Sequence, residues 1–354
     1  MKLPILALTL ALLCPALRAA EAPRADVVRA ALSTSANQYE WMLAHLPADA
    51  AKPLPRTFDH GRLVTVPTRD WTSGFFPGSL WYLFEATGDG KWRAAAEKFT
   101  GLLAPEQHNT QTHDVGFMLY CSYGNGLRLT GNEAYKSVLL NGAQSLSTRF
   151  NPTVGAIKSW DPGVGPYTFP VIIDNMMNLE LMMWAAREGP ADRYRDLAIR
   201  HADTTLAHHF RADHSTVHVV DYDPATGKVL QRVTHQGTSD DSAWARGQAW
   251  GLYGYTVMYR ETKDPRYLAQ AQQIAAFVMH HPRLPADKVP YWDFDDARIP
   301  NAPRDSSAAP IICSALLELR DAPVSRIEEL RAGGYAVTAD FNLDAARRGL
   351  GHFL

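Results

Sequence analysis

Two aspartates stand where predicted helices begin, and Asp174 has the more unusual surroundings. It follows Val-Ile-Ile and precedes Asn175 and two methionines in the run FPVIIDNMMNLELMMW (169–184). Burial among apolar side chains raises the pKa of a carboxyl group, and a carboxyl group that keeps its proton near neutral pH can act as a general acid. An aspartate at a helix start can also simply interact with free backbone N–H groups. The spacing alone leaves both interpretations of Asp174 open.

Asp114 begins another predicted helix, directly after His113. Taken alone, this position is typical of a helix cap. Two carboxylates at equivalent ends of different inner helices would, however, face one cavity. A pair of carboxyl groups is the minimum that glycosidic chemistry requires. We therefore take Asp114 and Asp174 together as candidate catalytic residues.

A third segment, THQGTSDDSAWARGQAW (234–250), combines charge with aromatic side chains. Residues 239–241 are predicted to cap the helix that follows, and Arg246 and Trp250 then lie four residues apart on one face. An arginine can form a bidentate pair with a carboxylate, and a tryptophan can stack on a sugar ring. This pair therefore suits an acidic sugar. The alternative is that Arg246 pairs with Asp240 or Asp241 for structural reasons.

Other aromatic and histidine side chains are weaker candidates. Trp71 and Trp160 could stack on a sugar or belong to the ordinary core. His209, His214 and His218 are loosely spaced and lack a cysteine or carboxylate at ligand spacing, so a hydrogen bond from His218 to a substrate is favoured over a metal site. The sequence contains no serine-hydrolase elbow, phosphate-binding loop or dinucleotide fingerprint.

The elements that must position these residues are almost all helices. Ten segments carry apolar residues at three- and four-residue spacing: 25–46, 74–86, 92–103, 115–129, 134–150, 172–187, 193–209, 242–260, 266–280 and 306–319. A further helix is plausible at 325–331. The strand-like runs 215–223 and 228–234 flank Pro-Ala-Thr-Gly and predict one hairpin.

Short turns of one type recur between the helices: TGDGKW, TGNEAY, GPADRY and TKDPRY, at 87–92, 130–135, 189–194 and 262–267. Each joins an aromatic- and methionine-rich helix to a more polar, alanine-rich one, with Gly or Asp-Pro ending the first helix and Asp or Asn available to cap the second. Repeated hairpins that each combine one apolar, aromatic-rich helix with one more polar helix predict two concentric rings of helices, of which the inner ring is apolar. The predicted fold class is all-α, an α/α toroid.

Composition limits the class of protein. The 354 residues are 46% hydrophobic with a net charge of −2, which argues against disorder and gives no general attraction to nucleic acid. Residues 1–20 have the charged start, apolar stretch and small residues of a secretory signal peptide, and no later segment is long and apolar enough to span a membrane. We expect a periplasmic or secreted protein. Cys121 and Cys313 lie in apolar helical contexts, which favours buried free thiols over a disulfide.

Several of these segments together resemble the unsaturated glucuronyl hydrolases, glycoside hydrolase family 88. The motifs are HDVGF (113–117), IIDNMMNL (172–179), VVDYDPATG (219–227) and SDDSAWARGQAWGLYG (239–254), supported by WTSGFFPGSLW (71–81) and RDSSAAPIICSALLEL (304–319). They occur in family order from about residue 40 to residue 319. The resemblance implies an (α/α)6 barrel of six helical hairpins over residues 23–319.

Carried over residue by residue, Asp174 matches the family's general acid/base and Asp114 its second catalytic carboxylate. The resemblance places nine further residues in the sugar site: Trp71, His113, Trp160, Asn175, His218, Thr234, Gln236, Arg246 and Trp250.

The implied substrate is an oligosaccharide that ends in the 4,5-unsaturated uronic acid left by polysaccharide lyases. Protonation at C4 of its vinyl ether and addition of water at C5 give a hemiketal that opens and releases the sugar. The resemblance implies no metal and no cofactor.

The resemblance fades after residue 319, where family members continue with a Gly/Ser-rich loop and closing helices. We predict that residues 320–354 form an atypical tail, that the barrel is incomplete at its C-terminus, and that the carboxylate-binding side of the sugar site is affected. Two alternatives therefore stay open: a catalytically weak glycan-binding relative and an unsaturated galacturonyl hydrolase.

Overall fold

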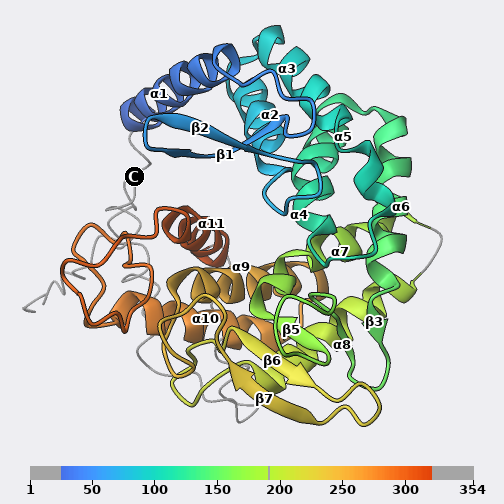
Figure 1. The fold of residues 1–354 in the computed structure, drawn as a ribbon, viewed down its shortest axis with the longest axis vertical. Helices are drawn as coiled ribbons and strands as arrows, with labels where there is room; N and C mark the ends of the chain where they lie inside the picture. Colours follow the sequence, from blue (N-terminus) through green and yellow to red (C-terminus); the bar gives the residue numbers. More distant parts are fainter. Residues whose placement is uncertain (1–24, 190–191, 321–354) are drawn as a thin grey trace, which may run out of the picture.

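Helical hairpins make up most of the chain and follow one another around a ring (Figure 1). The structure is a computed structural model that describes residues 25–189 and 192–320. The predicted signal peptide, nearly all of the predicted tail and the helix predicted at 325–331 lie outside the described residues. The main helices are α1 (Ala25–Ala44), α2 (Phe75–Thr87), α3 (Gly90–Gly101), α4 (Val115–Leu119), α5 (Asn125–Thr130), α6 (Glu133–Ser147), α7 (Leu179–Glu188), α8 (Arg193–His208), α9 (Ala245–Thr262), α10 (Pro265–His280) and α11 (Ala308–Arg320).

Two layers of helices confirm the predicted α/α barrel architecture. Around the centre, α2 packs on α5, α4 on α7, α7 on α9 and α9 on α11. On the outside, α3, α6, α8 and α10 each pack on the inner helix that precedes them. Because every outer helix returns the chain to the same side, all inner helices begin on one face of the ring, which we call the N-terminal mouth.

The short turns work as the sequence predicts in three of four cases. Gly88, Gly131 and Lys263 end their helices in the left-handed conformation, with φ of 69°, 66° and 60°. The next residue then caps the following helix through a side-chain oxygen that accepts a backbone N–H: Asp89, Asn132 and Asp264. At the fourth turn Gly189 is extended instead.

Two predicted helices begin later than expected. The helix predicted at 172–187 is preceded by a strand, β5 (Pro170–Ile172), and a 3₁₀ helix, η3 (Ile173–Met177), so that α7 starts at Leu179. The reason is that the N–H groups of Ile172 and Ile173 donate to Ser159 Oγ and to the carbonyl of His218. Residues 239–241 do not cap α9, which begins at Ala245.

One predicted helix contains a change of winding. The segment predicted at 115–129 is helical throughout, but α4 and α5 are joined by a π-helical turn, η2 (Tyr120–Gly124).

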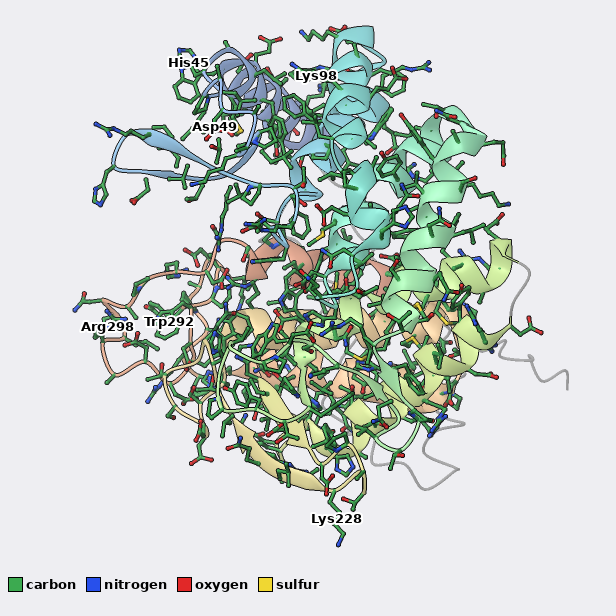
Figure 2. All side chains as sticks on the ribbon, turned by 45° about the vertical axis from the view of Figure 1, so that its right-hand side comes forward. His45, Asp49, Lys98, Lys228, Trp292 and Arg298 are labelled. Carbon is green, nitrogen blue, oxygen red and sulfur yellow. The ribbon has the colours of Figure 1, made fainter. Side chains whose placement is uncertain are left out.

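Strands are few in the described part of the chain and form three small sheets. The predicted hairpin is confirmed as β6 (Val219–Tyr222) and β7 (Val229–Val233), to which β5 adds a third strand in the order β5-β6-β7. Lys228 marks its tip in Figure 2. A second hairpin, β1 (Leu54–Asp59) and β2 (Arg62–Val66), was not predicted, although His60-Gly61 between two alternating runs is a recognisable turn signal. Short strands β3 (Phe150–Asn151) and β4 (Ala156–Ile157) form a third pair.

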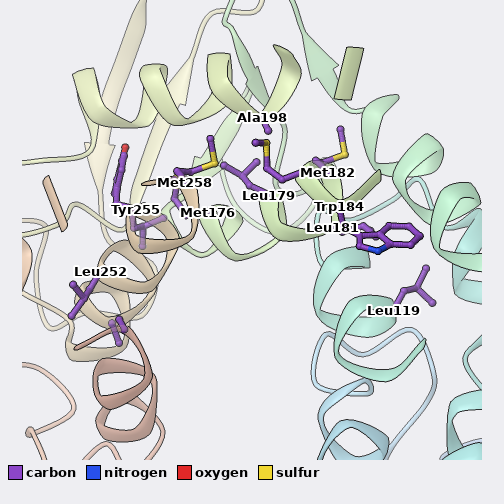
Figure 3. Packing of buried hydrophobic residues seen from close by; sticks show 14 of the residues in the cluster. Leu119, Met176, Leu179, Leu181, Met182, Trp184, Ala198, Leu252, Tyr255 and Met258 are labelled. Carbon is purple, nitrogen blue, oxygen red and sulfur yellow. The ribbon is translucent and has the colours of Figure 1, made fainter. Parts of the chain in front are cut away.

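Methionine and leucine side chains fill the space between neighbouring helices. Met176, Leu179 and Met258 are fully buried and bring η3, α7 and α9 together (Figure 3). Flexible, polarizable methionine side chains suit gaps of irregular shape between helices. Cys121 and Cys313 are free thiols, as predicted, but both are half-buried rather than buried. Among the described residues, no helix has the length and apolar character needed to cross a membrane.

Gly116 allows α4 to approach the residue before α7. A Cβ at this position would lie 2.6 Å from Oδ1 and 2.8 Å from Cα of Asn178, and Asn178 Oδ1 accepts a hydrogen bond from Phe117 N. The absence of a side chain at Gly116 therefore sets the spacing of two inner helices that begin beside the candidate catalytic aspartates.

We predict that Gly116→Ala lowers the free energy of unfolding by about 1–3 kcal/mol, the usual range for overpacking a buried position. Gly90→Ala is the matched control, because nothing lies within 4 Å of a Cβ at that helical position. It should leave stability unchanged or raise it slightly. Urea unfolding of both variants measures the difference, and equal stabilities would contradict the close-approach argument.

Candidate active site

The N-terminal mouth gathers the candidate residues from segments far apart in the sequence. Trp71 precedes α2, Asp114 is the residue before α4, Asp174 lies in η3, and Arg246 is in the first turn of α9. The rings of Trp71 and Trp250 each pack on Phe117, with centroids 5.7 and 5.2 Å away. The predicted convergence of these helix ends is therefore present in the fold.

A cavity of about 820 Å³ opens beside this cluster. Trp71, Arg246 and Trp250 line it together with apolar side chains of α2, β1, β2 and α11. The two aspartates lie outside its wall, which differs from the expectation that both would face it. The segments that carry them nevertheless meet, because Ser159 is hydrogen-bonded to the N–H groups of both His113 and Ile172. The charge of Asp114 also raises the pKa of Asp174.

Asp174 has the environment of a general acid. Its side chain is 13% exposed, and its Oδ2 atom is buried without a hydrogen-bond partner. Burial raises its pKa to about 6, Asp114 adds to the rise, and His113 and Arg246 oppose it. A capping aspartate would accept hydrogen bonds from backbone N–H groups, but Oδ2 of Asp174 accepts none.

Asp114 is held in the opposite state. Burial works against its ionisation, but the adjacent His113 ring, a 2.6 Å hydrogen bond from Thr112 Oγ1 and the charge of Arg149 together lower its pKa. It makes no cap hydrogen bond to α4 either. Two neighbouring carboxyl groups whose environments push their pKa values apart are typical of an acid and a base with separate roles.

Each aspartate faces a buried histidine. Nε2 of His113 lies 3.1 Å from Asp114 Oδ1, and Nε2 of His218 lies 3.7 Å from Asp174 Oδ2. Nδ1 of His218 accepts hydrogen bonds from the backbone N–H groups of His235 and Gln236, both at 3.1 Å. Burial lowers the pKa of His218 well below its ordinary value, so its ring is neutral with the proton on Nε2, the atom nearest Asp174.

Arg246 is bound to a carboxylate that the sequence did not single out. Its Nη1 donates to Asp305 Oδ2 at 3.1 Å, and its guanidinium lies 4.7 Å from the centre of the Trp244 ring. The alternative pairing with Asp240 or Asp241 is therefore wrong. Nη2 of the same guanidinium donates to Gln236 Oε1 at 3.4 Å. Only some of the guanidinium N–H groups are therefore available to bind a sugar carboxylate.

The tryptophans predicted to stack on the sugar differ in how exposed they are. Trp250 is 3% exposed, and its indole N–H is buried without a partner, so it is part of the wall between inner helices. Trp71 and Trp160 are half-buried and present more surface. Trp160 packs beside His235 and His218, with ring centroids 5.0 and 6.3 Å away.

The remaining predicted sugar-site residues are Asn175, Thr234 and Gln236. Asn175 is fully buried and donates from Nδ2 to the carbonyl of Ile157. Thr234 Oγ1 accepts from the N–H of Gly237. Gln236 is exposed at the mouth. The structure thus brings Gln236 to the site and gives Asn175 and Thr234 structural partners.

Asp293, which the sequence analysis missed, holds the loop that carries Thr234 and Gln236. Its Oδ2 accepts from Ser242 Oγ at 2.7 Å and from Thr238 N at 2.9 Å. It belongs to the loop 281–307, which Trp292 and Arg298 mark in Figure 2. The signal was available, since an aspartate between aromatic residues in YWDFDD resembles the apolar setting of Asp174.

The loosely spaced histidines do not converge. Nδ1 of His209 lies 3.4 Å from the carbonyl of Val217, and burial lowers the pKa of His209 to about 3. Within residues 25–189 and 192–320, no group of three or more His, Cys, Asp or Glu side chains is arranged to bind a metal.

Known proteins share both the sequence and the geometry. An unsaturated glucuronyl hydrolase of Formosa agariphila is 51% identical over 255 residues, which are 72% of this chain and 64% of that protein. One from Bacillus sp. (strain GL1) is 34% identical over 71% of this chain and 67% of its own length. An unsaturated chondroitin disaccharide hydrolase of Streptococcus pyogenes serotype M1 is 33% identical, with coverages of 75% and 67%.

This chain belongs to the unsaturated glucuronyl hydrolase family. A crystal structure of an unsaturated glucuronyl hydrolase specific for heparin matches it with a TM-score of 0.82 and 45% identity, covering 93% of this chain and 84% of that one. A variant bound to dGlcA-Glc-Rha-Glc matches with a TM-score of 0.75 and 29% identity, covering 91% and 84%. The chain spans less than two thirds of the Formosa relative. No protein-family model matches the chain.

We predict that Asp174→Asn stabilises the protein at neutral pH. The carboxyl group ionises at a pKa of about 6 in the folded state and near 3.8 when exposed, so folding becomes less favourable as the pH rises between these values. The amide removes this cost, and unfolding at pH 7.5 should require about 1–3 kcal/mol more than for the wild type. Below about pH 3, where the aspartate is protonated in both states, the difference should vanish.

Asp221→Asn is the matched control for this measurement. Asp221 is also buried, but its carboxylate accepts the backbone N–H groups of Thr168 and Phe169. Its replacement should destabilise the fold by about 1–3 kcal/mol. A loss of stability in Asp174→Asn at pH 7.5 would show that the Asp174 carboxylate has partners that stabilise it.

Proposed function

We propose that this protein is a glycoside hydrolase that releases 4,5-unsaturated uronic acid from oligosaccharides made by polysaccharide lyases. The observation that carries the proposal is the pair formed by Asp174 and Asp114, whose pKa values are shifted in opposite directions at an aromatic-lined mouth. Membership of the unsaturated glucuronyl hydrolase family supports the same reaction.

The chemistry follows from the two ionisation states. The neutral Asp174 carboxyl group donates its proton to C4 of the vinyl ether, and positive charge develops at C5 and the ring oxygen. Water adds at C5 and gives up a proton to a carboxylate, which restores the charge balance. The hemiketal formed at C5 then opens the ring and releases the rest of the oligosaccharide from C1. Ionised Asp114 favours the developing positive charge.

The half-buried Trp71 and Trp160 and the guanidinium of Arg246 provide the binding surface for an acidic sugar. Stacking on tryptophan suits the flat unsaturated ring, and Arg246 attracts its carboxylate. Because Nη1 of Arg246 already donates to Asp305, we propose that Arg246 attracts and orients the sugar carboxylate but does not bind it in a bidentate manner.

The glycan is best sought among glycosaminoglycan fragments. The 45% identical structure is of an enzyme specific for heparin, and the 33% identical relative is named for chondroitin disaccharides. We therefore propose unsaturated disaccharides from heparin as the first substrates to test. A panel that adds chondroitin-derived and galacturonate-derived products separates this function from the galacturonyl alternative, and binding without loss of the unsaturated-uronate absorbance would indicate a weak glycan-binding relative.

We also propose that the protein is exported. The charged start and apolar stretch of residues 1–20 support a signal peptide. Expression in a bacterial host with N-terminal sequencing of the mature protein tests this, and an unprocessed N-terminus in the cytoplasm would contradict it.

Asp174→Asn and Asp114→Asn should each reduce kcat by at least about 100-fold, the lower range for loss of a general acid or base. The measurement is the decrease of unsaturated-uronate absorbance with time. Asp89→Asn is the control, because asparagine caps helix α3 as well as aspartate does at this exposed position. If Asp174→Asn keeps a kcat within tenfold of the wild type, Asp174 is not the acid.

The pH profile gives an independent check. Because Asp174 must carry a proton to act as an acid, kcat/KM should fall as the pH rises through about 6. Asp114 must be ionised. Because its pKa is lowered, the loss of activity at acidic pH should begin below the ordinary pKa of an aspartate. A profile that rises through pH 6 would assign the opposite role to Asp174.

A further inference from the structure

Ser159 connects the segments that carry the two candidate catalytic aspartates. It is fully buried on the loop that follows β4. Its N–H donates to the carbonyl of Pro170 at 2.8 Å, and its carbonyl accepts from the N–H of His113 at 3.3 Å. The backbone of this one residue is therefore bonded both to the residue before Asp114 and to the strand that leads to Asp174.

The hydroxyl group of Ser159 repeats this connection. Oγ accepts a hydrogen bond from the N–H of Ile172 at 2.9 Å and lies 3.2 Å from Nδ1 of His113. Among the described residues it has no other hydrogen-bond partner. The N–H of Ile172 uses one of the two oxygen lone pairs. If Nδ1 of His113 donated to the other, the buried hydroxyl proton would have no acceptor, so the hydroxyl donates and Nδ1 is its acceptor.

This arrangement decides which nitrogen of His113 carries the proton. A ring that accepts a hydrogen bond at Nδ1 is neutral and has its proton on Nε2. That atom lies 3.1 Å from Oδ1 of Asp114, so the N–H is on the side of the carboxylate. His218 repeats the pattern beside Asp174, with backbone N–H groups in place of the serine hydroxyl.

We propose that Ser159 is a positioning residue of the hydrolase: it fixes His113 as the Nε2–H tautomer facing Asp114 and anchors the segment that leads into Asp174. The proposal rests on the proposed function for its effect on catalysis, but not for its effect on the histidine. The serine touches no substrate and acts through His113 and Ile172. Removing its hydroxyl leaves Nδ1 of His113 and the N–H of Ile172 without partners in a buried site.

The first measurement is the tautomer of His113 in the wild-type protein. In full-length protein labelled with ¹⁵N-histidine, two-bond correlation spectra show which ring nitrogen is protonated, and the loss of signals in His113→Gln assigns the ring. We expect a protonated Nε2 and an unprotonated Nδ1 near neutral pH. A proton on Nδ1 overturns the proposal, whatever the activity of the protein.

The second measurement compares Ser159→Ala with Ser145→Ala. Ser145 is also buried and donates its hydroxyl proton to the carbonyl of Gln107, but it lies on outer helix α6. Ser159→Ala should lower kcat about 10- to 100-fold, by analogy with the loss of a partner that orients a metal-bound imidazole, and should change the ¹⁵N signals of His113. Ser145→Ala should change neither.

A kcat for Ser159→Ala within twofold of the wild type, or an equal loss in Ser145→Ala, overturns the positioning role. If Ser159→Ala does not fold, the wild-type tautomer still decides the question. If the wild type cleaves no unsaturated uronide but shows the expected tautomer, the proposed function fails and the hydrogen-bond arrangement stands.

Discussion

The burial of one oxygen of the Asp174 carboxyl group, Oδ2, without a hydrogen-bond partner is the constraint on which the rest of the site depends. A carboxylate normally ionises far below neutral pH because water or N–H donors stabilise its charge. Here Oδ2 is buried and unpartnered, while Ile173 and Met176 on either side are fully buried. The pairing of β5 with β6 and the 3₁₀ turn of η3 fix the carboxyl group in this setting.

The ring of helices brings the N-terminal ends of several inner helices together at one mouth, which a single helix could not do. Asp114 and Asp174 are separated by one complete helical hairpin in the chain, yet the charge of Asp114 raises the pKa of Asp174. One is stabilised as an anion by Thr112 and His113, and the other lacks such donors. The difference between them thus comes from hydrogen-bond partners and not from depth of burial, since their exposed fractions are alike.

Carboxylates outside the pair organise the polar groups of the mouth. Asp305 binds Arg246, and Asp293 ties the loop that contains Thr234 and Gln236 to the segment 281–307. His218 links that loop to Asp174, because its ring accepts the N–H groups of His235 and Gln236. A substrate that moves the loop would therefore act on the histidine nearest the acid. These contacts connect Gln236 with Arg246 and place the His218 ring 3.7 Å from Oδ2 of Asp174.

The sequence by itself determined the helical hairpins, their turns and the two aspartates, because these depend on local patterns: apolar spacing, left-handed glycines, capping residues and an acidic side chain in an apolar run. It also carried the family motifs. Only the tertiary structure decided that the chain before α7 forms a strand, since Ile172 and Ile173 donate to Ser159 and His218, which are distant in sequence. Likewise the partner of Arg246 is Asp305 rather than its neighbours Asp240 and Asp241. Long-range hydrogen bonds and burial, which no local pattern encodes, set the protonation of the site.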